Sequence, residues 1–548
     1  MASLTSKHYV AVVAIITSFI GYILVKGRQS RRSFHVLKKN GLPMPEWSWL
    51  LGHSLVAKAV VERLPADAMI DNTITAIARD FSKSDMFYLD FWPMTVPMLI
   101  VNNPEAAIQA NQVHNLDKPP ILHDLMTDLS GGPHMFMMPE KEWKPWRRVF
   151  NTGFSDGYIL SLVPRIVEEV QTYTGMLRTH AKEADMFSLD EATLRLAFDL
   201  IGRTVLDSKL RYQHGPNALA DAMRSQIHWH SFGNEVNPWQ RWHPGRPIMQ
   251  RLNSWTMNRY IGKELDKRYG ERKKRTNDSG PLLDASRSVV SLALDSYMQD
   301  FHSDINESNM DRNFRRYATY QIRIFLFAGH DSTSTTICYC FYLLSKNPDA
   351  LSLISKEHDD ILGKDIAGVP DRLSSDPSLL NQLPYTLAVI KETLRLFPPA
   401  SSMRLGRPDV DLIDRHGKWY PTKDCHVWIV HMALHRNPRY WPEPDKFIPE
   451  RWLVPQGHPL HPVKGAWRPF EHGMRNCIGQ TLAVVNIKVG LALTIREFDV
   501  KDAYDEWDRM HPSKGIHHVN GERAYCIERG GMHPADGFPC RVSLRSST

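Results

Sequence analysis

The stretch Phe470-Glu471-His472-Gly473-Met474-Arg475-Asn476-Cys477-Ile478-Gly479 decides how this sequence is interpreted. It sets a cysteine just before an apolar helical pattern, with a glycine on either side and an arginine two residues earlier. The start of a helix favours a thiolate through the helix dipole and the free N–H groups, and glycine lets the backbone approach whatever the sulfur holds. N–H groups aimed at the sulfur would also tune a bound iron. The pattern therefore predicts that Cys477 is a thiolate ligand, although a single free cysteine is more often only a buried structural residue.

The composition of the 548 residues is that of an ordinary globular protein. Hydrophobic residues make up 42% and charged residues 23%, which excludes a disordered, collagenous or coiled-coil chain and is enough for a large core. Six cysteines in a chain of this length exclude a disulfide scaffold. No two of them are spaced as C-x-x-C, so a zinc ribbon is not expected.

The positive charge of the chain belongs to its N-terminus. The net charge is +7, and residues 1–45 contain seven basic residues and no acidic one. Subtracting these seven from the 67 Lys and Arg leaves 60, equal to the 60 Asp and Glu, so residues 46–548 carry no net charge. A nucleic-acid enzyme would usually carry a basic surplus in its body, so no nucleic-acid partner is expected.

That N-terminus is typical of a membrane anchor. Residues 9–25 are an uncharged run of 17 residues, the lower end of what spans a bilayer as a helix. A signal peptide would carry its charge before the run and a small-residue cleavage site after it, whereas here six basic residues follow the run. By the positive-inside rule this flank stays cytosolic. We therefore predict a membrane anchor over 1–25 and a basic flank with a proline-rich linker over 26–45. The protein would span the endoplasmic reticulum membrane once, with its body in the cytosol.

Helical patterns dominate the body, residues 46–548. Apolar residues recur at helical spacing over 311–346, 384–397 and 478–497, and the first two segments stop at prolines. Strand-like alternation is short and scattered, as at 539–544. The sequence therefore predicts a mostly α fold with small β-sheets.

The cysteine loop resembles the haem-binding loop of the cytochrome P450 monooxygenases, through the pattern F-x-x-G-x-R-x-C-x-G. The resemblance implies a single, mostly α-helical, triangular domain over 46–548, with haem b buried between two long helices and one transmembrane helix before the domain. Cys477 would be the axial ligand of the haem iron, and a thiolate there favours O–O cleavage. Arg475 would pair with a haem propionate, because a guanidinium forks onto a carboxylate. Phe470 and Gly473 would complete the cofactor loop.

Ala328-Gly329-His330-Asp331-Ser332-Thr333 lies in the middle of the 311–346 segment. An acid and hydroxyls in an apolar helix are costly to bury without purpose, although a packed helix with a solvated aspartate would also fit. The stretch resembles the oxygen-activation motif of the family, which implies catalytic roles for Asp331, Ser332 and Thr333. Asp331 and the next hydroxyl would relay protons to iron-bound dioxygen. Ser332 stands where the family usually has threonine, so its side-chain torsion is less restricted.

Two arginines and a glutamate fit the structural network of the family. Glu392 and Arg395 are one helical turn apart on the 384–397 segment, and Arg451 follows in Phe447-Ile448-Pro449-Glu450-Arg451-Trp452. A Glu–Arg pair at this spacing is common by chance and usually weak. Its position about 80 residues before the cysteine loop is what resembles the family. The resemblance implies that the three residues brace the core beside the haem and have no part in the chemistry.

Trp143-Lys144-Pro145-Trp146-Arg147 resembles the W-x-x-x-R motif of the family. One helical turn separates Trp143 from Arg147, so both face the same way, and the resemblance implies that both reach a haem propionate. A further propionate arginine is expected after the 384–397 segment. Arg404 and Arg407 both fit, and Arg407 is preferred.

The motifs cover roughly residues 140–480 in the order of the family. They imply a monooxygenase that activates O₂ with electrons from NADPH, and most simply hydroxylates an apolar small molecule. No Gly-rich dinucleotide fingerprint is evident, so the resemblance implies a separate NADPH–cytochrome P450 reductase, with cytochrome b5 as a second candidate donor. The texture of residues 467–473 resembles filamentous-fungal enzymes of secondary metabolism. Residues 116–138 resemble the variable loop above the haem, and residues 134–138 would either line the substrate pocket or be ordinary core.

Two other functional classes remain open. One is a thiolate-haem isomerase or dehydratase that needs neither O₂ nor a reductase, and Asp331 with its neighbouring hydroxyls argues against it. The other is a non-catalytic membrane protein that binds haem or a hydrophobic ligand, and an intact Cys477 argues against that.

Overall fold

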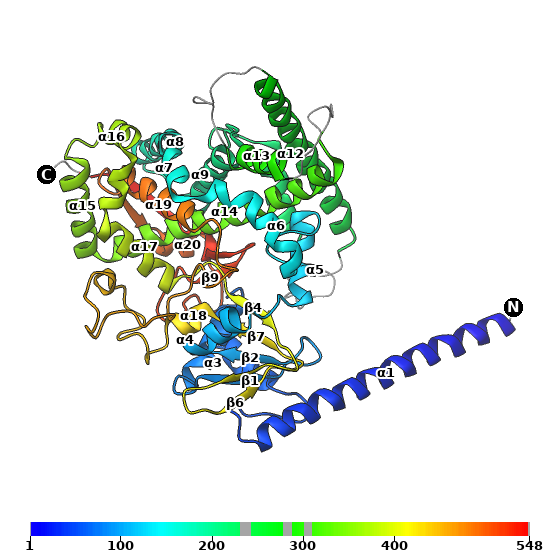
Figure 1. Ribbon diagram of the computed structural model, residues 1–548. Helices are drawn as coiled ribbons and strands as arrows, with labels where there is room; N and C mark the ends of the chain where they lie inside the picture. Colours follow the sequence, from blue (N-terminus) through cyan, green and yellow to red (C-terminus); the bar gives the residue numbers. More distant parts are fainter. Residues whose placement is uncertain (1, 231–242, 278–287, 301–309, 546–548) are drawn as a thin grey trace.

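The computed structural model describes residues 2–230, 243–277, 288–300 and 310–545, and most of them are helical (Figure 1). The helices are α1 (Ala2–Lys39), α2 (Ser54–Val61), α3 (Ile70–Asp80), α4 (Pro104–Ile108), α5 (Pro120–Ser130), α6 (Glu140–Asn151), α7 (Asp156–Ser161), α8 (Val163–Glu183), α9 (Leu189–Ile201), α10 (Ala218–His228), α12 (Arg246–Asn277), α13 (Val289–Asp300), α14 (Arg312–Lys346), α15 (Pro348–Leu362), α16 (Val369–Ser375), α17 (Pro384–Leu396), α18 (His431–His435), α19 (Gln480–Thr494) and α20 (Tyr504–Met510). The strands are β1 (Met86–Leu89), β2 (Met98–Val101), β3 (Phe187–Ser188), β4 (Ser402–Leu405), β5 (Asp411–Ile413), β6 (Trp419–Pro421), β7 (His426–Ile429), β8 (Phe498–Asp502), β9 (Cys526–Glu528), β10 (Met532–Pro534) and β11 (Pro539–Leu544). The predicted mostly α fold with small sheets is confirmed.

Helix α14 runs through the middle of the helical part (Figure 1). It begins where the Asp311 carboxylate accepts a hydrogen bond from the Phe314 N–H at 2.7 Å, the usual way in which a cap satisfies the first turn. It ends at Lys346, before the pair Asn347-Pro348. Because the helix is apolar on most sides, it is buried along most of its length. The helix therefore forms the wall on which the site described below is built.

Helices α17 and α19 pack near α14 and carry or follow two of the sequence motifs. Helix α17 ends at Leu396, since Pro398 and Pro399 follow and a helix rarely continues into proline. Helix α19 starts at Gln480, directly after the cysteine loop. Both helices lie within the ranges that the periodicity predicts, with ends that differ by up to three residues.

The sheets join parts of the chain that are distant in sequence. The largest has the strand order β1-β2-β7-β4, and its β2 pairs in parallel with β7 so that Leu99 faces Val427. The order β3-β11-β8 brings Cys540 opposite Phe187. Strands β9 and β10 form a hairpin. Two of these sheets therefore join strands near the C-terminus to strands formed much earlier in the chain.

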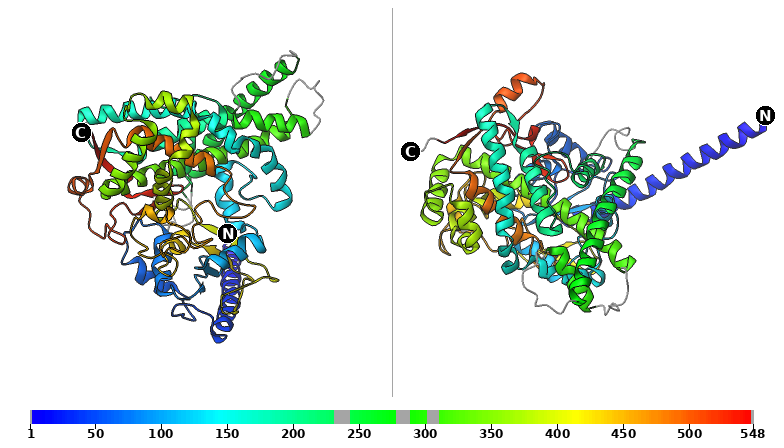
Figure 2. Two further views of the ribbon diagram at one scale, coloured as in Figure 1. Left: turned by 60° about the vertical axis from the view of Figure 1, so that its left-hand side comes forward. Right: turned by 90° about the horizontal axis from the view of Figure 1, so that it is seen from above.

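Helix α1 has two halves with different surroundings. Its N-terminal half projects away from the rest of the protein in Figure 1 and in the right-hand view of Figure 2. Its C-terminal half is docked, because Arg31 forms a buried ion pair with Asp90 and Phe34 is fully buried beside Trp47. The boundary predicted after residue 25 thus lies inside one continuous helix. Within the described ranges, no helix is long and apolar enough to cross a membrane, so the transmembrane span stays a prediction.

Candidate functional site

Cys477 occupies a tight loop directly before α19. Its N–H donates to the Phe470 carbonyl at 2.9 Å, which closes the loop, and Gly473 adopts a φ of +86° that suits glycine. The Cys477 side chain is accessible, yet the surrounding protein is dense enough that burial raises the pKa of its thiol. A hydrogen bond from Gly479 N–H and the charge of Arg147 oppose this rise. The sulfur is therefore recessed, and an N–H group is aimed at it as the pattern predicts.

Glu471 braces the loop from within. It has a left-handed φ of 55°, and its carboxylate accepts hydrogen bonds from Arg468 at 2.6 Å and pairs with His431 at 3.0 Å. Although burial opposes them, His431 and Arg468 hold the pKa of Glu471 well below its ordinary value. A charged, doubly paired carboxylate thus fixes the loop upstream of Cys477.

The predicted Trp143 and Arg147 meet the cysteine loop from α6. Arg147 donates to the backbone oxygen and to Oδ1 of Asn476, both at 3.1 Å. The Trp143 ring lies between two guanidinium groups, with Arg475 4.6 Å and Arg147 5.9 Å from its centre. Cation–π contacts of this kind hold both arginines beside the ring. The structure therefore brings Trp143, Arg147, Arg475 and Cys477 together.

Arg404 and Arg407 are separated by the structure. Arg404 on β4 is 1% exposed, and its Nε and Nη2 are buried without a hydrogen-bond partner in the described part of the chain. Burial lowers the pKa of Arg404 to about 10, and the nearby Arg475 and Arg468 act in the same direction. Arg407 instead lies near the surface and pairs with exposed Asp409 at 3.2 Å. Because Arg475 and Arg468 lie near Arg404, we propose Arg404 rather than Arg407 as the further propionate arginine.

Lys118 is a further cation of this group that the sequence patterns missed. It precedes α5, and its ammonium lies 4.4 Å from the centre of the Phe136 ring. Burial, and then the charge of Arg404, hold the pKa of Lys118 well below its ordinary value. A lysine followed by two prolines carries no motif, so only its position in space identifies it.

Residues 134–138 connect α14 to the cysteine loop. The Met135 N–H donates to the Gln321 side chain on α14 at 2.7 Å, and the Met138 carbonyl accepts from Arg475 at 2.9 Å. His134, Met135 and Met138 are buried. This stretch is therefore a wall of the cation group, and its backbone orients Arg475.

The cations and the cysteine fit the haem that the resemblance implies. Arg404 and Lys118 have no anionic hydrogen-bond partner among the described residues, although buried charges are normally paired. Two propionates would supply those anions, and guanidinium groups bind carboxylates well. Cys477 would supply the iron ligand, with Gly479 N–H tuning the sulfur.

The motif on α14 splits over two sides of the helix. Ala328 is exposed and Gly329 and Ser332 are half-buried, although His330 and Asp331 between them are buried. The Ser332 hydroxyl donates to the Ala328 carbonyl at 2.8 Å. Asp331 and Thr333 are buried, and Asp331 accepts a hydrogen bond from His533 on β10 at 3.0 Å. The structure thus places Ser332 on the accessible side and commits Asp331 to a partner that no sequence motif reveals.

The predicted Glu392, Arg395 and Arg451 form one buried network. Glu392 Oε1 accepts from Arg395 at 2.8 Å and from Arg451 at 3.1 Å, and all three side chains are fully buried. Arg395 also donates to three backbone carbonyls of residues 435–446. The network therefore ties α17 to the segment before the cysteine loop, as a structural role requires.

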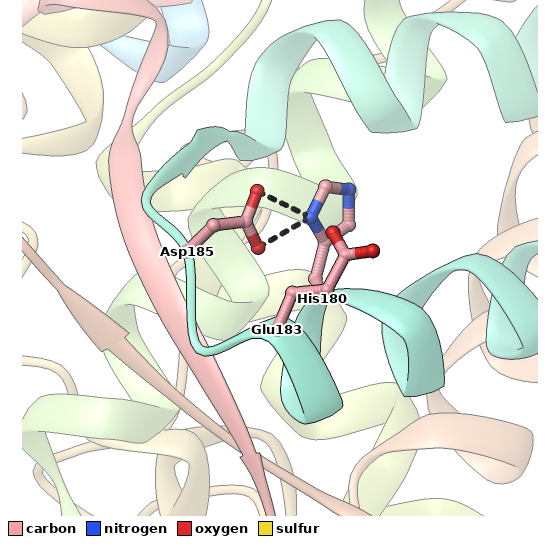
Figure 3. A group of neighbouring side chains, drawn as sticks. All are labelled: His180, Glu183 and Asp185. Carbon is pink, nitrogen blue, oxygen red and sulfur yellow. Dashed lines mark hydrogen bonds and ion pairs between the residues drawn. The ribbon is translucent and has the colours of Figure 1, made fainter.

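One group outside the cysteine site has the residue types of a metal site. His180, Glu183 and Asp185 gather at the end of α8 (Figure 3). His180 Nδ1 lies 2.9 Å from Asp185 Oδ1, and its ring stacks on Phe187 at 3.9 Å. This ion pair and stacking account for the group, which ends a helix and joins it to β3.

Known proteins resemble this chain along nearly its whole length. The sequence model of the family described as Cytochrome P450 matches residues 43–526. "Cytochrome P450 monooxygenase polC" of Polytolypa hystricis is 40% identical over 542 residues, which cover 98% of this chain and 96% of that protein. "Cytochrome P450 monooxygenase acrF" of Aspergillus aculeatus is 31% identical over 509 residues, which cover 88% of this chain and 99% of that protein.

Solved structures resemble it in fold. The structure described as "Crystal structure of cytochrome P450DA heme domain" superimposes with a TM-score of 0.68 at 20% identity, covering 92% of this chain and 98% of that one. At this identity the likeness concerns the fold alone.

Proposed function

The chain belongs to the cytochrome P450 family, and on this basis we propose that it is a haem-thiolate monooxygenase with Cys477 as the iron ligand. The observation that carries the proposal is a recessed thiol that faces an N–H group and lies near Arg147. It belongs to a group of cations that includes Arg404, two nitrogens of which have no hydrogen-bond partner among the described residues. The related proteins named above are called monooxygenases, which supports the reaction class. Haem bound through a thiolate activates O₂ and favours O–O cleavage, with electrons supplied one at a time.

The side chains of the site would hold and orient the cofactor. Arg147, Arg404, Arg475 and Lys118 would neutralise the propionates, and Trp143 would keep two of these guanidinium groups in place. Glu471 would keep the cysteine loop in one conformation through Arg468 and His431. Glu392, Arg395 and Arg451 would support the same side of the protein from α17.

The Ser332 hydroxyl would act as a proton donor on the accessible side of α14. The usual threonine has a β-methyl group that restricts its torsion. Here the hydrogen bond from Ser332 Oγ to the Ala328 carbonyl, at 2.8 Å, supplies that restriction. Asp331 and Thr333 would support Ser332 from the buried side, as the acid and the second hydroxyl of the proton relay. A serine at this position is thus compatible with ordered proton delivery.

The partners follow from the same proposal. A separate NADPH–cytochrome P450 reductase would supply electrons, with cytochrome b5 as a second candidate donor. The substrate would be an apolar small molecule, most simply an intermediate of secondary-metabolite biosynthesis that becomes hydroxylated. Residues 1–25 would hold the enzyme in the endoplasmic reticulum membrane, residues 26–45 would lead into the body, and residues 46–548 would form the catalytic domain on the cytosolic side.

Oxygen labelling tests the proposal. The purified protein, supplied with a fungal reductase, NADPH and ¹⁸O₂, is incubated with a panel of apolar terpenoids and polyketides. One labelled oxygen atom in a product, absent when NADPH is omitted, supports a monooxygenase. A product that forms without NADPH and O₂ contradicts it and favours the isomerase alternative. A Cys477→Ala variant serves as the control.

A further inference from the structure

A chain of three ionisable side chains lies behind the oxygen-activation motif. His533 on β10 joins Asp331 on α14, at 3.0 Å from Nε2 to Oδ1, to Asp190 in the first turn of α9, at 2.8 Å from Nδ1 to Oδ1. All three are buried, with exposed fractions of 5% for Asp331, 1% for His533 and 2% for Asp190. The three residues come from three different elements. This set of hydrogen bonds therefore exists only when α9, α14 and the β9–β10 hairpin are packed together.

The hairpin is shaped to admit the Asp331 carboxylate. Its turn contains Gly530 and Gly531, and a Cβ atom on Gly531 would lie only 2.2 Å from Asp331 Oδ2. Gly530 has a φ of +107°, which side chains rarely adopt. The hairpin is held on α14 by the Thr335 hydroxyl, which donates to the Met532 carbonyl at 2.7 Å. The turn thus approaches Asp331 through its backbone, and His533 is the only side chain of the hairpin with a described hydrogen bond to that carboxylate.

The surroundings make His533 the cation of the group. Burial alone would lower its pKa, but the two carboxylates overcome this and raise the pKa of His533 to about 10. The other titratable groups that face Asp190 and Asp331 are neutral at pH 7, and Arg224 is a further cation that acts on His330. His330 on α14 has a pKa lowered by burial to about 4, and burial raises the pKa values of Cys338 and Tyr339, which face Asp190, well above their ordinary values.

We propose that His533 and Asp190 are positioning residues for Asp331. The His533 imidazolium holds the Asp331 carboxylate on the buried side of α14, and Asp190 holds the imidazolium from its other nitrogen. Asp331 and Ser332 are consecutive residues that face different sides of the helix. The strength of the His533 pair therefore sets how readily the Asp331 carboxylate turns from the hairpin to serve Ser332.

This inference rests on the proposed function, and its first test does not. The free energy of unfolding is measured for wild type, His533→Gln, Asp331→Asn and the double variant, with His358→Gln as a matched control. His358 is also buried but bonds Thr386 on α17 at 2.8 Å. We expect His533→Gln and Asp331→Asn to be non-additive, because each leaves the same pair broken, whereas His358→Gln adds independently to either. Additivity within the His533–Asp331 cycle would overturn the proposal.

The pH dependence of the stability difference tests whether His533 is charged. The pKa of His533 is raised from 6.5 to about 10 by folding, so its contribution to stability is complete below 6.5 and is lost as the pH rises through the folded value. The stability gap between wild type and His533→Gln should therefore shrink from pH 7 to pH 10. A gap that stays constant or widens over this range contradicts an imidazolium between two carboxylates.

The second test measures proton use with reductase and NADPH. When proton delivery fails, two electrons from NADPH and two protons convert O₂ to H₂O₂, which is released. We expect the ratio of H₂O₂ formed to NADPH consumed to rise several-fold in His533→Gln, because Asp331 then lacks its cationic partner, and to lose the pH dependence that titration of His533 gives to wild type. Asp190→Asn should shift the ratio the same way by less, and it carries the test if His533→Gln does not fold.

Different outcomes mark a failure of the positioning role and a failure of the proposed haem-thiolate function. Both variants could keep full haem content, an unchanged H₂O₂ ratio and an unchanged pH profile of that ratio. The hydrogen bonds among Asp190, His533 and Asp331 would then be purely structural, and the positioning role would be overturned. Absence of a haem-thiolate spectrum in wild type would defeat the proposed function instead. In that case the stability cycle still decides whether His533 and Asp331 are coupled.

Discussion

At the scale of single residues, Arg404 and Arg407 lie three positions apart in the sequence, yet Arg404 is buried and Arg407 lies near the surface. Two nitrogens of Arg404 have no hydrogen-bond partner in the part of the chain that the structure describes, whereas Arg407 pairs with exposed Asp409. We predict that Arg404→Leu weakens haem affinity by about 10- to 100-fold, because a hydrogen bond to a charged group contributes about 1.5–3 kcal/mol. Haem transfer to apomyoglobin measures this affinity. Arg407→Leu is the control, and an equal or larger loss in that variant would reverse the assignment.

The residues that carry motifs could be predicted and those that carry only geometry could not. Cys477 and Arg475 lie in one loop of ten residues that resembles a family motif, so the sequence is enough to predict them. His533 bonds Asp331, and Lys118 lies near Arg475, although the residues of each pair are about 200 to 350 positions apart in the sequence. No local pattern encodes such pairs, because they depend on how α5, β10 and the cysteine loop pack.

At the scale of elements, α17 shows why a weak sequence pattern becomes a strong structural feature. A Glu–Arg pair one turn apart contributes little on a helix surface, but here Glu392 is fully buried between Arg395 and Arg451. We predict that Glu392→Gln lowers the free energy of unfolding by about 3–5 kcal/mol, because two buried cations lose their anion. Urea denaturation checks this. Glu62→Gln, which breaks an exposed pair with Lys58, should cost less than about 1 kcal/mol, and equal effects of the two changes would refute the bracing role.

Helix α1 gives a second prediction at this scale. Its two halves differ, since Arg31 and Phe34 dock on the body while residues nearer the N-terminus project from it (Figure 2). Removal of residues 2–25 should release the protein from membranes and leave its melting temperature unchanged. Removal of residues 2–40 should also lower the melting temperature, because the loss of a buried phenylalanine costs about 3–5 kcal/mol. Fractionation and thermal unfolding measure both effects. A 2–25 deletion that stays on membranes would contradict the anchor.

The helices themselves could be predicted closely because their signals are local. Periodicity and a terminal proline define α14 within one residue at each end, and the alternation over 539–544 coincides with β11. The pairing of the strands could not be predicted, since β2 pairs with β7 and β3 with β11 across more than 300 residues. Hydrophobic alternation identifies a strand and leaves its partner undetermined.

At the scale of the whole molecule, the site exists because distant segments converge on α14 and on the cysteine loop. Residues 134–138 join the two by hydrogen bonds to Gln321 and from Arg475. The C-terminal hairpin closes on Asp331 from the other side through His533. The cofactor site and the proposed proton relay through Asp331 therefore depend on the same packing. Substitutions in one should alter the other.

The central claim is that Cys477 is a thiolate ligand of haem iron, and the carbon monoxide spectrum of the reduced protein tests it most directly. We predict a strongly red-shifted Soret band for wild type. The band should be lost in Cys477→Ala and retained in Cys425→Ala, which removes a buried cysteine of the sheet-side core. A band at the position typical of histidine-ligated haem, or a thiolate band that persists in Cys477→Ala, would contradict the assignment.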